Sequence, residues 1–169
     1  LDFVNLLNIF TGFSMVVSST YIINDLYDKQ SDQEHPTKKF RGIAANKISL
    51  NKAITISILL MVFGLSLIYF IYDQALLITL LYILISLSYT IKLKYLKYFD
   101  LASIVSLFLI RLLLGSIVIG IYLSNSLILF VTFTCLGIVL GKKISIYKDN
   151  KIISSDVKSF LKKSYSLKS

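Results

Sequence analysis

Five long apolar segments constrain the fold of this 169-residue chain more than any other feature of its sequence. These segments are 3–23, 53–72, 75–91, 101–122 and 124–141. At ~1.5 Å per residue, a helix of about 20 apolar residues crosses a hydrocarbon core of ~30 Å. A continuous helix also satisfies its backbone polar groups inside a bilayer, where water is absent. The sequence therefore predicts an all-α fold, a polytopic transmembrane helical bundle, with a single membrane domain over residues 1–169.

The basic residues lie almost entirely on one side of the topology that five spans produce. The segments on that side are 24–52, 92–100 and 142–169. They contain 17 of the 18 lysines and arginines, whereas the turns near Asp73 and Ser124 contain none and Arg111 lies within a span. Because lysine and arginine concentrate in cytoplasmic loops, these segments are expected in the cytosol and the spans in the cytoplasmic (inner) membrane. The same rule explains the net charge of +9, so no nucleic-acid partner is expected.

The ends of the chain and its single cysteine lead to three further expectations. No basic residue precedes the first apolar stretch after Leu1, so a signal peptide is not expected. The chain starts at the edge of a span and stops in a charged segment, which indicates a fragment. Cys135 lies inside an apolar run and has no second cysteine to pair with, which favours a small buried side chain.

Three aspartates follow the first apolar segment, in the sequence NDLYDKQSD. Asp25, Asp28 and Asp32 are spaced i, i+3 and i+7, so on a continued helix they share an arc of about 60°. Asn24 adds an amide oxygen one turn before Asp28. Like charges this close repel one another unless a cation lies among them, and hard oxygen ligands suit Mg²⁺. A solvated acidic helix end is the alternative interpretation, but the direct continuation of an apolar span favours a metal site.

A basic cluster follows the aspartates within ten residues, in the sequence HPTKKFRG. Lys38, Lys39 and Arg41 oppose the carboxylates, and a substrate with a diphosphate needs both a metal face and cationic donors. Part of this cluster also serves as a topology signal. His35 precedes Pro36 and therefore lies in an extended turn, which favours a loop former or a phosphate ligand over a proton shuttle.

Four other polar residues near the third and fourth spans are candidate site residues with two interpretations each. Arg111 is about eleven residues into its span, where a charge is costly, and it either binds a substrate phosphate or pairs with an acid or helix carbonyls. Asp100 either caps a helix that starts at Leu101 or acts in catalysis. Tyr89 is either an interfacial aromatic or a substrate contact, and Lys94 either a topology signal or a phosphate ligand.

The aspartate motif resembles that of a known family. NDLYDKQSD matches the NDxxDxxxD signature of the UbiA superfamily of membrane prenyltransferases, through Asn24, Asp25, Asp28 and Asp32. The continuation QEHPTKKFRGIAANKIS differs from the N-x-P-x-R-P of ordinary prenyl-transferring members. It resembles the decaprenyl-phosphate phosphoribosyltransferase branch, although Gly42 stands where that branch usually has proline.

A second stretch, SYTIKLKYLKYFD followed by LIRLLLG, is similar to the same branch. Its Tyr-x4-Lys-x5-Asp pattern and the arginine behind it correspond to Tyr89, Lys94, Asp100 and Arg111. The family's second polar patch falls on GKKISIYKDN, where Ile146 stands at the position expected to be acidic.

The resemblance implies a UbiA-type bundle of about nine spans, of which the five here are the second to the sixth, around a cavity open to cytosol and lipid. It implies transfer of 5-phosphoribose from 5-phosphoribosyl 1-diphosphate to a polyprenyl (decaprenyl) phosphate, with Mg²⁺ as cofactor and Asp25, Asp28 and Asp32 as catalytic metal ligands. The implied substrate-binding residues are Asn24, His35, Lys38, Lys39, Arg41, Tyr89, Lys94, Asp100, Arg111, Lys142 and Lys143. The fragment alone is expected to be inactive, because it lacks helices that complete the cavity.

Two other functions remain as alternatives. A UbiA-type prenyltransferase would move an isoprenoid chain from its diphosphate to an aromatic or other small acceptor, and the aspartates serve that reaction equally well. The HPTKKFR segment favours the sugar donor, because a 5-phosphate needs additional cationic ligands. A transporter or channel fragment would distribute charges along a pore, whereas only Arg111 lies deep within a span.

Overall fold

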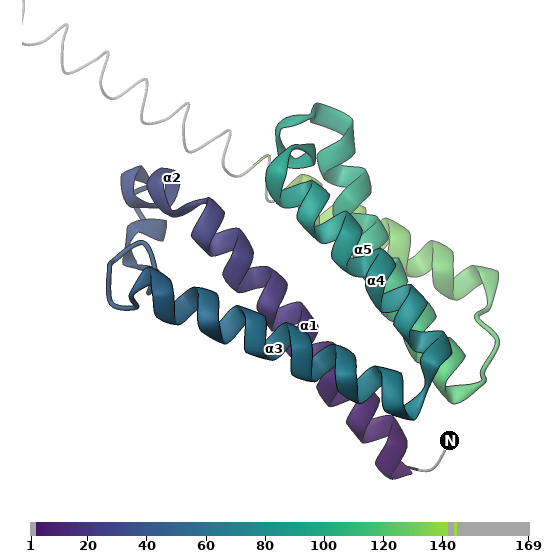
Figure 1. The fold of residues 1–169 in the computed structure, drawn as a ribbon. Helices are drawn as coiled ribbons and strands as arrows, with labels where there is room; N and C mark the ends of the chain where they lie inside the picture. The colour runs from purple at the N-terminus through teal and green to yellow at the C-terminus, as the bar shows by residue number, and fades with distance from the viewer. Residues whose placement is uncertain (1–2, 142–143, 145–169) are drawn as a thin grey trace, which may run out of the picture.

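The computed structural model describes residues 3–141 and residue 144, and every regular element in that part of the chain is a helix (Figure 1). The long helices are α1 (Phe3–Tyr27), α3 (Leu50–Ile71), α4 (Asp73–Ile91) and α5 (Lys97–Ile119). The short ones are α2 (Lys29–Glu34) and the 3-10 helices η1 (Lys38–Phe40) and η2 (Leu93–Tyr95). A further apolar helix covers Asn125–Gly141. The all-α helical bundle expected from the sequence is confirmed.

Four of these helices are long and apolar enough to cross a membrane. They are Phe3–Tyr27, Leu50–Ile71, Asp73–Ile91 and Tyr98–Ile119. Only 17–28% of each span is buried inside the bundle, and many large apolar side chains are exposed, as expected of helices that face lipid or further helices. The helix Asn125–Gly141 covers the fifth expected span but is shorter than the other four, so its crossing of the membrane stays a prediction.

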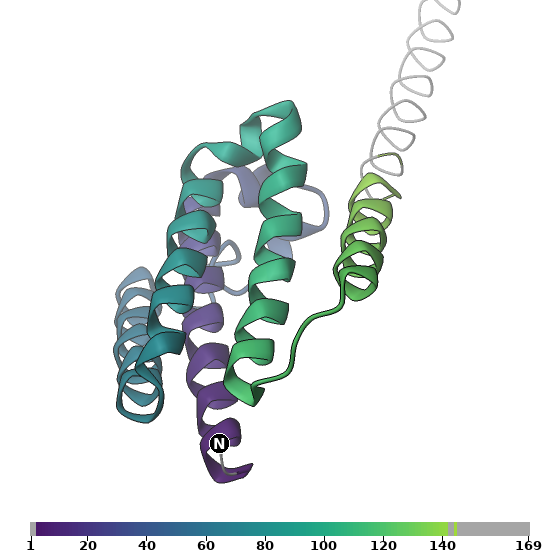
Figure 2. The same cartoon turned by 90° about the vertical axis from the view of Figure 1, so that its right-hand side faces the viewer.

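The helices form two antiparallel pairs that meet through α1 and α4. Figure 1 shows α1 beside α3 and α4 beside α5, and α4 also contacts both α1 and α3. In Figure 2 the helix Asn125–Gly141 lies on the far side of α5, after a turn at Gly120 whose φ of 76° is left-handed. Cys135, on that helix, is buried, as the sequence predicted.

The pair α1 and α3 is held by small residues at a close crossing. A Cβ atom placed on Gly64 would lie 2.5 Å from the carbonyl oxygen of Gly12, so only glycine fits there. Further along, the buried Ser19 hydroxyl donates to the carbonyl oxygen of Ser57 at 2.7 Å. Small residues and hydrogen bonds between helices are the usual means of association in membranes, where hydrophobic burial drives little. This crossing fixes the position of α1, the helix that ends at the aspartates.

The charged segments gather at one end of the bundle. In Figure 1, α2 and the loop that leads to α3 lie at the same end as the connection between α4 and α5. The opposite end carries the start of α1, the α3–α4 turn and the connection after α5. The helix order therefore brings the aspartate motif and the segment around Lys94 to the same end, as alternating spans predict.

Candidate functional site

The aspartate motif lies at the end of α1 and in α2. The structure interrupts the helix at Asp28, so the single continued helix expected from the spacing is divided in two. Helical hydrogen bonds nevertheless cross the interruption: Asp28 N donates to Asn24 O at 2.9 Å, and Asp32 N donates to Asp28 O at 2.8 Å. The aspartates therefore still follow one another at about one helical turn, although Asp28 itself lies between α1 and α2.

Arg41 joins the first and third aspartates. Its Nη1 atom lies 2.9 Å from Asp25 Oδ1 and 2.9 Å from Asp32 Oδ2, so the two oxygens are at most twice that distance apart. The side chain of Asp32 is only 3% exposed, and Lys38 Nζ lies 3.8 Å from its other oxygen. Two members of the basic cluster, Arg41 and Lys38, thus face the carboxylates, and the Arg41 guanidinium lies between two of them.

Asp28 pairs with a different cation from a distant part of the chain. Its Oδ1 atom forms an ion pair with Lys94 Nζ, which η2 brings to the end of α1. Lys94 also lies over the ring of Tyr27, 4.8 Å from its centroid, and the Tyr27 hydroxyl donates to the carbonyl oxygen of Ile91 at 3.4 Å. Lys94 therefore contacts the candidate site directly, through Asp28.

Asn24 turns toward α4 and not toward the carboxylates of its own helix. Its Oδ1 atom accepts a hydrogen bond at 3.2 Å from the hydroxyl of Thr90, a residue that is buried. The sequence reasoning missed Thr90, although it directly follows Tyr89 in the segment SYTIK. A short polar residue one position after a candidate site residue was the available signal.

Tyr89 and Asp100 form the remaining part of this polar end. The Tyr89 side chain lies close to Asp100 and within electrostatic range of Asp28. Asp100 is buried in the first turn of α5, which begins at Lys97 with Leu96 as its N-cap. The interpretation of Asp100 as the cap of a helix that starts at Leu101 is therefore wrong, because the helix begins one turn earlier.

Two of the expected phosphate ligands, His35 and Lys39, form no ion pair with the carboxylates in the described part of the chain. The exposed ring of His35 accepts hydrogen bonds at Nδ1 from the backbone N–H groups of Thr37 (3.3 Å) and Lys38 (3.4 Å). His35 is thus a loop former that supports η1. Lys39 lies over the ring of Phe40, 5.3 Å from its centroid, and pairs with no acid among the residues described.

Arg111 lies inside the bundle, held by aromatic residues. Its Nη2 atom donates to the hydroxyls of Tyr82 at 2.8 Å and Tyr21 at 3.3 Å, and the guanidinium lies over the rings of Tyr82 and Phe108. Its Nε atom is buried and has no hydrogen-bond partner within the described part of the chain. Among the described residues, Arg111 pairs with no acid and with no helix carbonyl, although the sequence allowed either. Its contacts with Tyr21, Tyr82 and Phe108 were not predicted.

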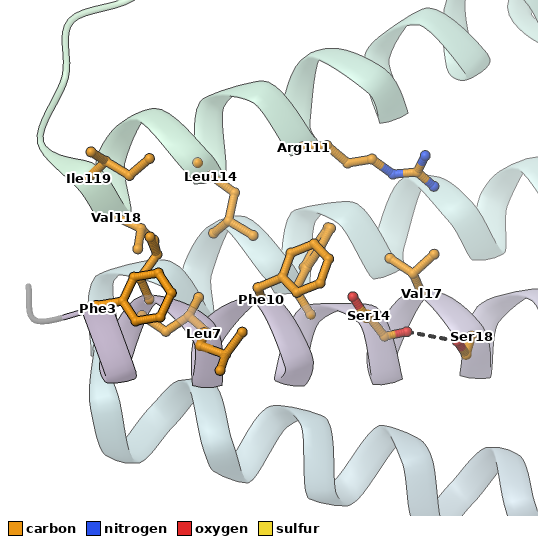
Figure 3. Close-up of a pocket in the computed structure, with 14 residues that line it drawn as sticks. Phe3, Leu7, Phe10, Ser14, Val17, Ser18, Arg111, Leu114, Val118 and Ile119 are labelled. Carbon is orange, nitrogen blue, oxygen red and sulfur yellow. Dashed lines mark hydrogen bonds between the residues drawn. The ribbon is translucent and has the colours of Figure 1, made fainter.

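A cavity of about 660 Å³ between α1 and α5 ends at this arginine. Figure 3 shows Phe3 near Val118 at one end, with Arg111 extending toward Val17 at the other. The lining is almost entirely apolar apart from Arg111, Ser14 and Ser18. Tyr21, which contacts Arg111, precedes Asp25 by one helical turn, about 5.4 Å along the axis. The apolar cavity and the polar end of the bundle therefore adjoin at Arg111.

The chemistry of the donors fits a hard cation. Asp25, Asp28 and Asp32 offer carboxylate oxygens from successive turns, and Arg41 shows that a positive group already lies between two of them. No three acidic, histidine or cysteine side chains in the part of the chain that the structure describes converge as a preformed metal cluster. Each carboxylate is instead paired with a basic side chain. Lys142 and Lys143, also expected at the site, lie outside the described residues.

Comparison with known proteins gives a consistent result. A family model described as the UbiA prenyltransferase family matches residues 1–158. The chain is 33% identical over 134 residues to a decaprenyl-phosphate phosphoribosyltransferase of Mycobacterium tuberculosis, which covers 79% of this chain and 44% of the relative. A protein with the same description from Mycolicibacterium smegmatis is 34% identical over 79% of this chain and 42% of its own length.

An uncharacterised protein, y4nM, of Sinorhizobium fredii is also similar, with 32% identity over 79% of this chain and 26% of the relative. The chain thus spans less than half the length of these curated relatives. Their similarity extends over most of the chain, and the expected resemblance to the phosphoribosyltransferase branch is confirmed. The chain belongs to the UbiA prenyltransferase family, whose model matches it from residue 1 to residue 158.

Proposed function

We propose that the full-length protein transfers 5-phosphoribose from 5-phosphoribosyl 1-diphosphate to a polyprenyl phosphate, in a reaction that depends on Mg²⁺. The observation that carries this proposal is the meeting of three carboxylates with Arg41, Lys38 and Lys94 at one end of the bundle, next to an apolar cavity. Such a site offers ligands for a metal-bound diphosphate and space for a lipid chain. The relatives described as decaprenyl-phosphate phosphoribosyltransferases support this choice of substrates.

The donor would bind at the polar end. Asp25, Asp28 and Asp32 are the residues that would hold Mg²⁺, and the ion would supply charge neutralisation for the departing diphosphate. Arg41 and Lys38 lie beside these carboxylates and donate hydrogen bonds to phosphate oxygens. Phosphate groups at both ends of the sugar explain why this loop carries more cationic side chains than one diphosphate requires.

The acceptor would bind where the polar end meets the cavity. The polyprenyl chain lies along the apolar lining between α1 and α5, and its phosphate meets Arg111. Because Arg111 is held only by hydroxyls and rings among the described residues, its charge is available for an anion. Arg111 contacts Tyr21, which precedes Asp25 by about one helical turn, so the acceptor phosphate would lie toward the donor, with the chain pointing away into the bundle.

The reaction then needs positioning and electrostatic stabilisation, with no protein nucleophile. The bond between C1 of ribose and the diphosphate oxygen breaks, and a bond forms between C1 and an oxygen of the acceptor phosphate. The diphosphate keeps the electron pair of the broken bond. Fixed cations next to both phosphates lower the barrier because they stabilise the charge that develops on the leaving group and hold the nucleophile in line.

The location follows from the same assignment. We infer that the protein is integral to the cytoplasmic (inner) membrane, with the polar end in the cytosol, because 17 of its 18 basic residues belong to segments on that side. The isolated segment 1–169 is expected to be inactive, since it spans less than half of its relatives and lacks part of the surrounding bundle.

A transfer assay in membranes containing the full-length protein tests the proposal. Labelled 5-phosphoribosyl 1-diphosphate and polyprenyl phosphate are expected to yield a labelled lipid that depends on Mg²⁺. A matched incubation supplies a prenyl diphosphate with an aromatic acceptor. Prenylated product there, with no labelled lipid in the first reaction, would reverse the choice in favour of a UbiA-type prenyltransferase.

A further inference from the structure

The guanidinium of Arg41 occupies a place between two carboxylates that the proposed function assigns to the metal. Its Nη1 atom is 2.9 Å from an oxygen of Asp25 and 2.9 Å from an oxygen of Asp32. We propose that Arg41 is an internal substitute for the metal: it neutralises these carboxylates in the absence of ligand and leaves them when metal and diphosphate bind. The identity of the incoming ligand rests on the proposed function.

The burial of Asp32 explains why a substitute cation is needed. Its side chain is 3% exposed, and an ionised carboxylate in such a place is strongly destabilised unless a cation compensates it. Lys38 Nζ lies 3.8 Å away, too far for a hydrogen bond, so it compensates less directly. Arg41 therefore provides most of the compensation for the Asp32 charge in the ligand-free site.

The exchange requires movement of the Arg41 side chain alone. The backbone that follows it is anchored, because Ile43 and Ala44 are buried and Gln33 Nε2 donates to Ala44 O at 3.0 Å. The Arg41 side chain itself is 42% exposed, so one face of it is already open to solvent. Rotation of this side chain can clear the carboxylates while the loop keeps its place.

Electrostatics gives the exchange its direction. A guanidinium and a divalent ion between the same two carboxylates repel each other, and the divalent ion is attracted about twice as strongly at equal distance. A guanidinium released next to a diphosphate finds a new partner, to which it can donate two parallel hydrogen bonds. Arg41 thus acts first as the cation of the ligand-free site and then as a ligand of the donor phosphate.

Binding of Mn²⁺ to the ligand-free full-length protein tests the exchange, because the measurement needs neither donor nor acceptor. Free Mn²⁺ is measured by electron paramagnetic resonance during a titration. Arg41→Gln removes the competing cation and is expected to tighten Mn²⁺ binding about tenfold, equivalent to about 1.4 kcal/mol. Lys47→Gln removes an exposed charge from the same loop and is expected to leave the affinity unchanged. Unchanged or weaker binding of Mn²⁺ to Arg41→Gln overturns the proposal.

A thermal measurement covers the case in which Arg41→Gln is less stable than the parent protein. A ligand that binds only the folded state raises its stability according to its affinity. Saturating Mn²⁺ is therefore expected to raise the Tm of Arg41→Gln by more than that of the parent protein. An equal or smaller rise contradicts the exchange, whatever the starting stability of the variant.

A measurement of donor binding distinguishes a failure of this inference from a failure of the proposed function. With Mn²⁺ present, Arg41→Gln is expected to bind 5-phosphoribosyl 1-diphosphate about tenfold more weakly, because one charged phosphate ligand is lost. Tighter Mn²⁺ binding without phosphoribosyl transfer by the parent protein supports the exchange and contradicts the proposed donor. Failure of both proteins to bind Mn²⁺ contradicts the exchange and the metal site together.

Discussion

Arg41 and Arg111 lie in opposite surroundings in the bundle. Arg41 lies at the polar end and contacts two carboxylates, Asp25 and Asp32, each at 2.9 Å. Arg111 lies within a span and contacts two tyrosine hydroxyls and two aromatic rings, with its Nε atom buried and unpaired among the described residues. The charge of Arg41 is thus compensated inside the chain, whereas hydroxyls and rings only partly compensate that of Arg111.

The two arginines are therefore suited to binding an anion in different ways. A compensated arginine at a solvent-facing loop can exchange partners with little change in buried charge. An arginine that is held in place by hydroxyls and rings, beside an apolar cavity, keeps its position and attracts an anion to it. The first arrangement suits a soluble donor that enters from the cytosol, and the second suits a lipid acceptor whose chain occupies the cavity. The variants below test whether the two arginines have these different roles, in order of decreasing expected effect.

The aspartate end is expected to be the more sensitive of the two regions. Asp28→Asn removes a proposed metal ligand and leaves Lys94 without its acidic partner. Activity of the full-length protein is expected to fall by about 10³-fold or more, because stabilisation of the leaving diphosphate is lost. Initial rates of labelled-lipid formation measure the effect. Asp73→Asn, at the opposite end of the bundle, is the matched control, and an equal loss in that variant would rule out the assigned active face.

Arg111→Gln is expected to affect the acceptor and spare the donor. Loss of a charged hydrogen bond to the acceptor phosphate costs about 2 kcal/mol, or about 30-fold in kcat/KM for the polyprenyl phosphate. The Michaelis constant for the phosphoribosyl donor is expected to change by less than about threefold, since the donor lies one turn away. Steady-state kinetics with each substrate varied in turn separates the two effects. A weakening confined to the donor would reverse the roles of the two arginines.

Tyr82→Phe tests how the position of Arg111 is maintained. This substitution keeps the ring beside the guanidinium and removes the buried hydroxyl that accepts at 2.8 Å. The expected loss in kcat/KM for the acceptor is about fivefold to tenfold, or about 1 to 1.4 kcal/mol, because the Tyr21 hydroxyl still holds the arginine. Tyr21→Phe removes a longer, more exposed bond of 3.3 Å and is expected to have a smaller effect. Equal losses in both variants would contradict the assignment of Tyr82 as the main hydroxyl that positions the arginine, and no loss in either would show that neither hydroxyl does.

Thr90→Val is expected to give the smallest change, at the polar end. It removes the hydroxyl that holds Asn24 Oδ1 and leaves the shape of the side chain almost unchanged. One neutral hydrogen bond is worth about 1 kcal/mol, so Mn²⁺ affinity is expected to fall about threefold to fivefold. Thr79→Val, which removes a buried hydroxyl bonded within α4, serves as the control. A larger loss in the control would show that helix stability, and not Asn24, sets the affinity.

The long apolar segments and the aspartate spacing were sufficient to predict much of this molecule. Segments of this length leave the backbone in a bilayer no alternative to helix, so the helical class followed from hydropathy alone. The expected first span ended at residue 23, whereas α1 continues to Tyr27 and carries Asn24 and Asp25 on its last turn. Polar residues at a membrane edge do not end a helix by themselves, so the helix extends beyond the apolar span, as the spacing of the aspartates predicted.

The partners of the charged residues were much less predictable. Spacing along a helix indicated that the aspartates share a face, but it contains no information about Arg41, nine residues beyond Asp32 and across a turn. The break at Asp28 and the start of α5 at Lys97 also escaped prediction, because the loops between spans are set by packing at the end of the bundle. Thr90 was missed for the same reason.

The sequence alone was enough to predict a helical chain with aspartates in successive turns, and it predicts that nearly all basic residues lie on one side of a membrane. These properties depend on local periodicity and hydropathy, which neighbouring residues encode. Only the tertiary structure decided which cation meets which carboxylate, that Arg111 meets Tyr21 and Tyr82, and that a cavity ends at this arginine. Those contacts join residues up to 90 positions apart, so they arise from helix packing, which no local pattern in the sequence specifies.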